Sequence, residues 1–464
     1  MTVFGKKLAP DAPPPTTNPV EEPAASHFVA TQDRPSTSQE DVQNLVSDQV
    51  FLRIEPLEAV SVSKEKLKAS VIRIIGEISV EKKILMNQQE QQFLADSVLD
   101  EMIGLGPLEP FLADNTINDI LVNGPQSIYV ERRGKLEFTN RRFRNDAHVL
   151  HLAQRIASSI GRRIDESSPM LDARLADGSR VNVIIPPLSI KGPCISIRKF
   201  SKTALNFNKF ITLGTVSQPL ATVLEISARC RLNIMISGGT GSGKTTLLNS
   251  LSHFIDPDER IITIEDAVEL QLQQRHVVQL ETRAANVEGH GEIDQRQLMR
   301  NALRMRPDRI IIGEVRGPEA FDMMQAMNTG HNGSMSTVHA NSARDALDRI
   351  ENLILMGTNN LPMKAIRTQI VNALDLLIHV ERMRDGVRRV TEVKEISGIE
   401  GDVVTLGNVF TFVSHGQSAD GKLRGNFEST NFKPSFFPKV EYFGLADAFM
   451  EALTAGAVAV QNGN

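Results

Sequence analysis

The feature that most constrains this chain is the glycine-rich stretch from Gly238 to Thr246. Its glycines precede Lys244 and Thr245 at the spacing of a P-loop, in which backbone N–H groups turn toward nucleotide phosphates. The apolar run 234–236 before it predicts a buried strand, and apolar residues between 247 and 255 recur with helical period. The alternative is a glycine-rich turn that binds nothing, but the strand and helix on either side favour a nucleotide site.

The P-loop assigns a role to each part of the stretch. Lys244 is expected to reach the β and γ phosphates of ATP, and the hydroxyl of Thr245 is placed to hold Mg²⁺. The helix that follows presents its positive end to the same anion. The predicted nucleotide-binding residues are Gly238, Gly239, Thr240, Gly241, Ser242, Gly243, Lys244, Thr245 and Thr246.

Length and composition limit the other possibilities. A chain of 464 residues is expected to form two or three domains. A net charge of -5, no Trp and 5% aromatic residues argue against direct binding of nucleic acid. The only cysteines, Cys194 and Cys230, are compatible with a reducing cytosol. No stretch approaches about 18 uncharged apolar residues, so we expect no transmembrane segment and a membrane role only through a partner.

The pattern along the chain divides it into segments. Prolines dominate the start, helical periodicity follows, and short strands with turn residues come next. Downstream, predicted strands at 234–237, 260–265, 277–281, 309–313 and 334–339 alternate with helices, which predicts an α/β fold with parallel strands. The predicted segments are a disordered head (1–55), a helical bundle (56–105), a small α+β domain (106–200), a linker (201–215) and the nucleotide-binding domain with C-terminal strands and a tail (216–464).

Two acidic positions follow predicted strands downstream of the P-loop. Glu265 and Asp266 end one strand, and Glu314 follows another after Gly313. Hydrolysis needs a carboxylate that orients Mg²⁺ or positions water. An isolated strand-end carboxylate is more often a surface cap or an ion-pair partner, but two in this order after a P-loop favour a catalytic role. The usual P-loop enzyme has an Asp directly after the apolar strand, so Gly313-Glu314 is a departure.

Two histidines lie at the last of these predicted strands: His331 precedes it and His339 ends it. They could sense the γ-phosphate and couple its loss to domain movement. A metal site is the weaker interpretation, because no cysteine or further histidine lies nearby. A lone histidine is more often a structural hydrogen-bonding residue, and this interpretation applies in part to His331.

Together these motifs resemble the type II and type IV secretion ATPase superfamily, and within it most of all the ATPase of tight-adherence (Flp) pilus assembly. The resemblance rests on the P-loop, the Thr-Ile-Glu-Asp box at 263–266, the Ile-Gly-Glu-Val-Arg run at 312–316 and the Thr-Val-His-Ala-Asn box at 337–341. It extends over roughly residues 60–383. It implies a RecA-like ATPase core and a cytoplasmic homo-hexamer bound to an inner-membrane pilus platform protein.

The resemblance also implies roles for individual residues. Glu314 is expected to act as the general base, and Glu265 with Asp266 to help hold Mg²⁺ or the attacking water. His339, and less strongly His331, fall in the family's histidine box. Arginines of the N-terminal domain neutralise phosphate charge in the family, and the candidates here are Arg174, Arg180 and Arg198. Each of these arginines could instead form an ordinary salt bridge.

Three functions fit the sequence. The leading hypothesis is an ATP-driven motor for pilus assembly, with retraction also open, or for secretion. The alternatives are a nucleotide-gated assembly scaffold with little hydrolysis, and a nucleic-acid translocase on the same core, which the composition disfavours. Phosphate release, and its response to DNA or RNA, separates the three.

Overall fold

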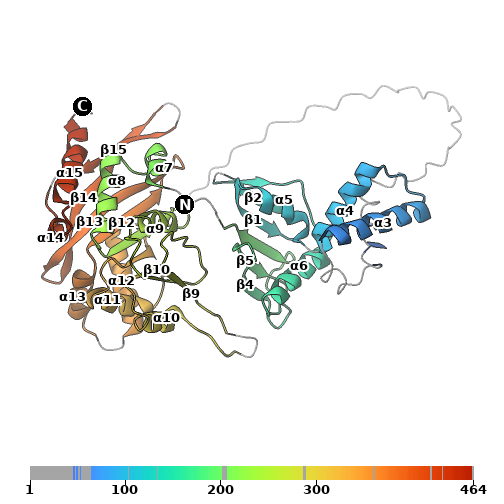
Figure 1. Cartoon of the computed structure of the whole chain (residues 1–464), viewed down its shortest axis with the longest axis horizontal. Helices are drawn as coiled ribbons and strands as arrows, with labels where there is room; N and C mark the ends of the chain where they lie inside the picture. Colours follow the sequence, from blue (N-terminus) through green and yellow to red (C-terminus); the bar gives the residue numbers. More distant parts are fainter. Residues whose placement is uncertain are drawn as a thin grey trace, which may run out of the picture. The chain divides into compact units, whose positions relative to one another are not determined.

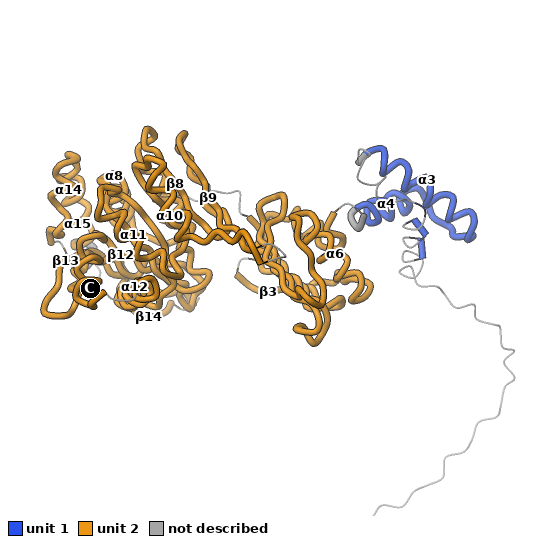
Figure 2. Tube along the Cα trace, turned by 90° about the horizontal axis from the view of Figure 1, so that it is seen from below, with its two compact units in different colours: residues 1–103 blue, residues 104–464 orange. Residues whose placement is uncertain are grey.

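A computed structural model describes residues 45–46, 49–50, 53, 64–102, 104–132, 134–200, 206–285, 289–358, 361–418, 421–430 and 432–461. The chain forms two compact units, residues 1–103 and 104–464 (Figure 2). Most of the predicted head (1–55) lies outside the described residues. In the part of the chain that the structure covers, no helix is both long enough and apolar enough to cross a membrane.

The first unit is built on two helices, α3 (Lys64–Lys82) and α4 (Gln88–Met102). The predicted apolar face of α3 is buried, because Leu67, Val71 and Ile75 pack into a common core with residues of α4. The prediction for α4 is partly wrong, since Phe93 is 65% exposed. Ala95 and Leu99 take the place of Phe93 in the core.

The second unit begins with an antiparallel six-stranded sheet in the order β3-β2-β1-β6-β5-β4. The predicted hairpins at 127–138 and around Asp177-Gly178 are confirmed as β2–β3 and β4–β5, and Gly178 has the positive φ of +92° that its turn needs. Helix α6 covers one face and buries Val149, Leu152 and Ile156 in this sheet's own core. The elements are η1 (Gly106–Leu108), α5 (Glu109–Ala113), β1 (Ile117–Asn123), β2 (Ile128–Arg132), β3 (Lys135–Phe138), α6 (Asp146–Ser159), β4 (Met170–Arg174), β5 (Arg180–Ile184) and β6 (Cys194–Arg198).

A nine-stranded mixed sheet forms the rest of the unit, in the order β15-β14-β13-β12-β7-β11-β10-β8-β9 (Figure 1). The strands from β12 to β9 in this order are parallel to their neighbours, and β13, β14 and β15 are added antiparallel. The strands are β7 (Ile234–Gly238), β8 (Ile261–Glu265), β9 (Val277–Glu281), β10 (Arg309–Val315), β11 (Met335–His339), β12 (Leu376–Arg382), β13 (Arg388–Glu400), β14 (Val403–Gln417) and β15 (Leu423–Ser429).

Helices cover both faces of this large sheet, and the side chains of β7 alternate between the two cores that result. Ile234 and Ile236 point into one core and Met235 into the other, so the apolar run 234–236 contributes to the cores on both faces. The first face carries α7 (Phe207–Thr212), α8 (Gln218–Arg229), α9 (Lys244–Ser252), α14 (Phe437–Tyr442) and α15 (Ala446–Gln461). The second carries α10 (Gln295–Ala302), α11 (Glu319–Asn328), α12 (Ala343–Gly357) and α13 (Met363–Ala373).

The α/β class and all five predicted strands between 234 and 339 are confirmed. The predicted C-terminal strand pair corresponds to the starts of β13 and β14, but the sequence patterns gave no sign of β15. Within the stretch 201–215, expected to be a linker, α7 places Phe207 and Phe210 in the core of the large sheet. Two phenylalanines three residues apart provide the apolar face that a linker would lack.

Candidate functional site

The P-loop joins β7 to α9 at the carboxyl edge of the large sheet. Gly238 cannot carry a side chain, because a Cβ there would lie 2.3 Å from the carbonyl oxygen of Val380 on β12. Gly241 and Gly243 have φ of +69° and +100°, in the left-handed region that favours glycine. Sequence spacing and backbone geometry therefore agree on a tight loop whose N–H groups can face an anion.

Lys244 begins α9 and is buried beneath this loop. Its Nζ donates hydrogen bonds to the carbonyl oxygens of Gly238 and Gly239, at 3.0 and 3.2 Å. Burial lowers the pKa of Lys244, and attraction to the Glu314 carboxylate opposes that shift. The lysine charge thus lies within electrostatic range of the Glu314 carboxylate near the end of β10.

Glu265, at the end of β8, is 3% exposed. Its Oε2 accepts hydrogen bonds from the backbone N–H groups of Glu269 and Leu270, while its Oε1 is buried without a partner among the described residues. Burial raises the pKa of this carboxyl to about 7. A Cβ at Gly313 would lie 2.9 Å from Cγ of Glu265, so the glycine that departs from the usual P-loop pattern makes room for this side chain.

Glu314 lies in an irregular part of β10, where the register with β11 shifts between Ile312 and Val315. Such irregularities redirect side chains near functional sites. Its Oε2 is 2.6 Å from one terminal nitrogen of Arg316, and the other terminal nitrogen lies 3.2 Å from Oδ2 of Asp266. One guanidinium therefore joins the two acidic positions that the sequence placed on separate strands.

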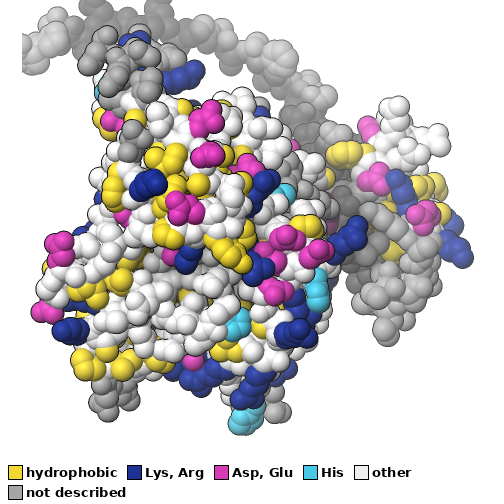
Figure 3. Space-filling model, turned by 60° about the vertical axis from the view of Figure 1, so that its left-hand side comes forward, with side chains coloured by type: hydrophobic (Ala, Val, Ile, Leu, Met, Phe, Trp, Pro, Cys, Tyr) yellow, Lys and Arg dark blue, Asp and Glu magenta, His cyan; other side chains and the backbone are white. Residues whose placement is uncertain are grey.

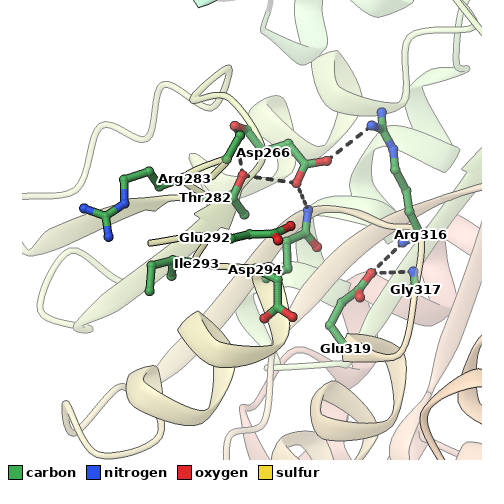
Figure 4. A pocket seen from close by; sticks show the side chains of 11 residues that line it. Asp266, Thr282, Arg283, Glu292, Ile293, Asp294, Arg316, Gly317 and Glu319 are labelled. Carbon is green, nitrogen blue, oxygen red and sulfur yellow. Dashed lines mark hydrogen bonds and ion pairs between the residues drawn. The ribbon is translucent and has the colours of Figure 1, made fainter. Parts of the chain in front are cut away.

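Asp266 and Arg316 border a cavity of about 330 Å³. In Figure 4, Asp266 is linked to Arg316 and Thr282, while Arg283 points away from this group. Asp266 also accepts a hydrogen bond from Nε2 of Gln295 at 2.8 Å. The Asp266 carboxylate is thus held by protein groups, whereas Glu265 keeps one oxygen unpaired.

The three predicted arginines form one row across adjacent strands, since Arg174 pairs in register with Arg180, and Arg180 with Arg198. Arg174 contacts Glu281 at 3.1 Å and Arg180 contacts Glu269 at 3.5 Å, so both reach acidic residues of the large-sheet part of the chain. Arg198 pairs instead with Asp119 on its own sheet, at 3.1 Å. The structure therefore groups the three side chains but gives only two of them partners near the acidic boxes.

The two histidines are not brought together. His339, exposed at the carboxyl end of β11, pairs in register with Gly238 at the start of the P-loop. His331 precedes β11 at the opposite edge of the sheet, where its Nδ1 lies 3.2 Å from the carbonyl oxygen of Ala326 at the end of α11. His339 thus lies beside the start of the P-loop, whereas His331 caps the end of a helix away from it.

The residues present fit a magnesium nucleotide. Thr245 is half-buried beside Lys244, and its hydroxyl has no hydrogen-bond partner within the described ranges. Among those same residues no group of three or more His, Cys, Asp and Glu side chains could hold a metal ion alone. The Thr245 hydroxyl, on the other hand, suits Mg²⁺, which takes few protein ligands and completes its shell with phosphate oxygens and water.

Two arginines at this edge were not among the site residues predicted from the sequence. Arg316 stands in the run that also carries Glu314, so a positive charge two residues after the candidate base was an available signal. Arg388 donates from Nε to the carbonyl oxygen of Gly241 at 2.8 Å, across 147 residues of chain. Arg388 reaches the P-loop because β13 is added antiparallel to the sheet, and no local sequence pattern predicts that contact.

The family model described as type II/IV secretion system protein matches residues 101–397. A Mycobacterium tuberculosis protein whose name refers to conjugal transfer is 40% identical over 309 residues, 65% of this chain and 87% of that protein. The type IV secretion system protein VirB11 of Bartonella quintana is 30% identical over 344 residues, 66% of this chain and 96% of its own length.

Among solved structures, the VirB11 ATPase of the Brucella suis type IV secretion system, in complex with sulphate, is 28% identical to this chain. The match covers 62% of this chain and 94% of that one, with a TM-score of 0.34.

Proposed function

The chain belongs to the type II/IV secretion system protein family, and we propose that within it the chain is an ATP-hydrolysing motor for tight-adherence pilus assembly. The proposed motor is a homo-hexamer on the cytoplasmic side of the inner membrane, bound to a pilus platform protein. The matched family model supports the broad class, because it extends over more than half of the chain. The resemblance of the four motifs to the tight-adherence ATPase supports the narrower assignment.

One observation carries the hydrolytic part of the proposal. The buried P-loop lysine, Lys244, and Glu314 near the end of β10 lie at the same carboxyl edge of the large sheet, two strands apart in its order, and the Glu314 carboxylate raises the pKa of the lysine against the effect of burial. Hydrolysis requires these two functions together: a cation on the transferring phosphoryl group and a carboxylate that positions water. A loop that only bound phosphate would not need the carboxylate.

The proposed roles follow from these positions. The P-loop backbone and Lys244 bind the phosphates, and Glu314 takes a proton from the attacking water. Thr245 supplies a ligand to Mg²⁺, which when bound neutralises phosphate charge. Glu265 and Asp266 remain the candidates for ordering the water or the metal shell, and His339 lies where it could sense the nucleotide. Arg174 and Arg180 are the candidates for coupling the smaller sheet to the nucleotide.

The experiment is steady-state phosphate release by purified full-length protein with MgATP. Wild-type protein should hydrolyse ATP, Lys244→Ala should abolish nucleotide binding and turnover, and Glu314→Gln should bind MgATP but lose at least about 100-fold in turnover. Normal hydrolysis by Glu314→Gln would remove Glu314 from the role of base. Light scattering with and without nucleotide tests the hexamer, and a monomer under both conditions would contradict it.

One observation favours a second candidate, the nucleotide-gated scaffold. Oε2 of Glu314 lies 2.6 Å from Arg316, so one oxygen of the candidate base is paired with a cation and is a weaker proton acceptor. A scaffold would bind MgATP tightly and release phosphate negligibly even as a hexamer.

The names of the relatives refer to secretion and to conjugal transfer, so a nucleic-acid translocase is the next function to weigh. A translocase acting on nucleic acid would be stimulated by DNA or RNA, and the phosphate-release assay tests this directly. The face in Figure 3 carries both Lys or Arg and Asp or Glu side chains, with Lys and Arg gathered toward its lower edge. The net charge of -5 and the 5% of aromatic residues place direct nucleic-acid binding below the pilus motor.

A further inference from the structure

Arg388 lies across the P-loop, although it belongs to β13 and not to any of the P-loop motifs. Its Nε donates to the carbonyl oxygen of Gly241 at 2.8 Å. Its Cδ would be 3.2 Å from a Cβ built on Gly243, so the side-chain stem passes where this glycine leaves space. The guanidinium is thus fixed at one nitrogen beside the loop that is proposed to bind phosphates.

The positive charge of Arg388 is not neutralised by an ion pair in the described part of the chain. Its cross-strand neighbour in the β12–β13 hairpin is another arginine, Arg382, whose terminal nitrogen donates to the carbonyl oxygen of Gly134. Burial lowers the pKa of Arg388 and the charge of Arg382 lowers it further, while Glu131 opposes the shift without lying within ion-pair distance of Arg388 among the described residues. Like charges directly opposite on adjacent strands destabilise a sheet, and an anion between or beside them removes that cost.

The next residue shows what a structural arginine looks like in the same hairpin. Arg389 is 7% exposed, and its two terminal nitrogens contact both oxygens of Asp385, at 2.9 and 2.8 Å. Its guanidinium also lies over the ring of Phe412. Arg389 is buried in an ion pair with Asp385, whereas Arg388 is exposed and, within the described part of the chain, hydrogen-bonds to the Gly241 carbonyl alone.

We infer that Arg388 is a further nucleotide-binding residue, with its free terminal nitrogens directed at the phosphates that the P-loop binds. A guanidinium matches phosphate oxygens in a bidentate geometry, and such charge-assisted hydrogen bonds are stronger than neutral ones. The hydrogen bond from Nε to Gly241 fixes the orientation of the guanidinium before nucleotide binds, which reduces the conformational entropy lost on binding. This inference rests on the proposed function, because it assumes that the P-loop holds ATP.

The test is titration of full-length protein with a fluorescent ATP analogue and Mg²⁺, comparing wild type with Arg388→Ala, Arg388→Gln and Arg388→Lys. We expect the dissociation constant to rise about tenfold for Arg388→Ala, the effect of losing one charge-assisted contact. Arg388→Lys should recover part of the loss. The matched control is Arg384→Ala, which removes an exposed arginine from the same hairpin and should bind like wild type.

Arg388→Gln separates a nucleotide contact from a loop support. Glutamine keeps an N–H group able to bond the Gly241 carbonyl but removes the charge, so weak binding equal to that of Arg388→Ala supports the inference. Wild-type affinity in Arg388→Gln, or in Arg388→Ala, overturns it. If wild-type protein itself fails to bind the analogue, the proposed function fails as well, and this result is distinguishable because Arg384→Ala then fails in the same way.

Discussion

An arginine lies beside carboxylates at each end of β10, and the two arginines differ in how far they are exposed to solvent. Arg309 begins the strand, and its side chain is 0% exposed. It contacts both oxygens of Glu259 and donates to the carbonyl oxygens of Ala228 and Gly333. Arg316 follows the strand at its other end, is 54% exposed, and contacts one oxygen each of Asp266 and Glu314.

The difference separates the edge that holds the sheet together from the edge available for chemistry. A buried ion pair with all its hydrogen bonds made has one arrangement, because any movement leaves a charge unpaired. An exposed arginine between two carboxylates can exchange one for water or phosphate at small cost. The carboxyl edge of a parallel sheet is also where ligands bind in α/β folds. The two arginines thus mark a rigid edge and an adaptable one.

The largest expected effect comes from breaking the rigid edge. Arg309→Met leaves the buried Glu259 carboxylate with Arg231 as its one remaining ion-pair partner among the described residues, so we expect a loss of about 4 kcal/mol in the free energy of unfolding. Urea unfolding followed by circular dichroism measures it. The control Arg229→Ala removes an exposed arginine of α8 and should cost less than about 1 kcal/mol. Equal losses in the two variants would contradict the contrast.

The second prediction concerns Glu265, whose pKa is raised by burial to about 7 from an ordinary 4.5. The folded state then holds this proton more tightly than the unfolded chain, so the stability from Glu265 is full below pH 4.5 and lost as pH rises through 7. The difference corresponds to about 3 kcal/mol. Glu265→Gln should therefore gain stability relative to wild type as pH rises from 5 to 8, measured by urea unfolding without nucleotide or magnesium. A constant difference across this range would contradict the prediction.

Two glycines give a smaller and matched comparison. A Cβ at Gly333 would lie 2.6 Å from a terminal nitrogen of Arg309, and Gly333 has a φ of +84°. Gly333→Ala should therefore cost about 2 kcal/mol from strain at the rigid edge. Gly313→Ala meets Cγ of Glu265 without a positive φ, so about 1 kcal/mol is expected. A larger loss of thermal stability in Gly313→Ala than in Gly333→Ala would reverse the assignment of the edges.

How far the sequence predicts this molecule depends on whether a signal is local. The P-loop, the apolar strands and Glu265 and Glu314 at their ends follow from periodicity and spacing, because each depends on neighbours along the chain. The partners of these residues could not be predicted in the same way. Arg388 reaches Gly241 across 147 residues, and Arg309 reaches Ala228 across 81. Such contacts depend on strand order, which no single segment encodes.

The smallest effect on stability, and the sharpest test of the adaptable edge, is expected from Arg316. An exposed arginine contributes under about 1 kcal/mol to folding, so Arg316→Ala should unfold close to wild type. Turnover should respond more strongly, because the guanidinium positions the Glu314 carboxylate from 2.6 Å. We expect kcat to fall about tenfold with KM for ATP unchanged, since a positioning residue acts on the transition state and not on binding.

Arg316→Lys keeps a charge but not the fork that contacts two carboxylates at once, so it should recover only part of kcat. Arg316 could instead hold Glu314 in an ion pair that must break before the reaction. In that case Arg316→Ala would raise kcat, and the positioning role would be wrong. If Arg316→Ala destabilised the chain as much as Arg309→Met, the two ends of β10 would not differ. The role of Arg316 would then be in folding and not in catalysis.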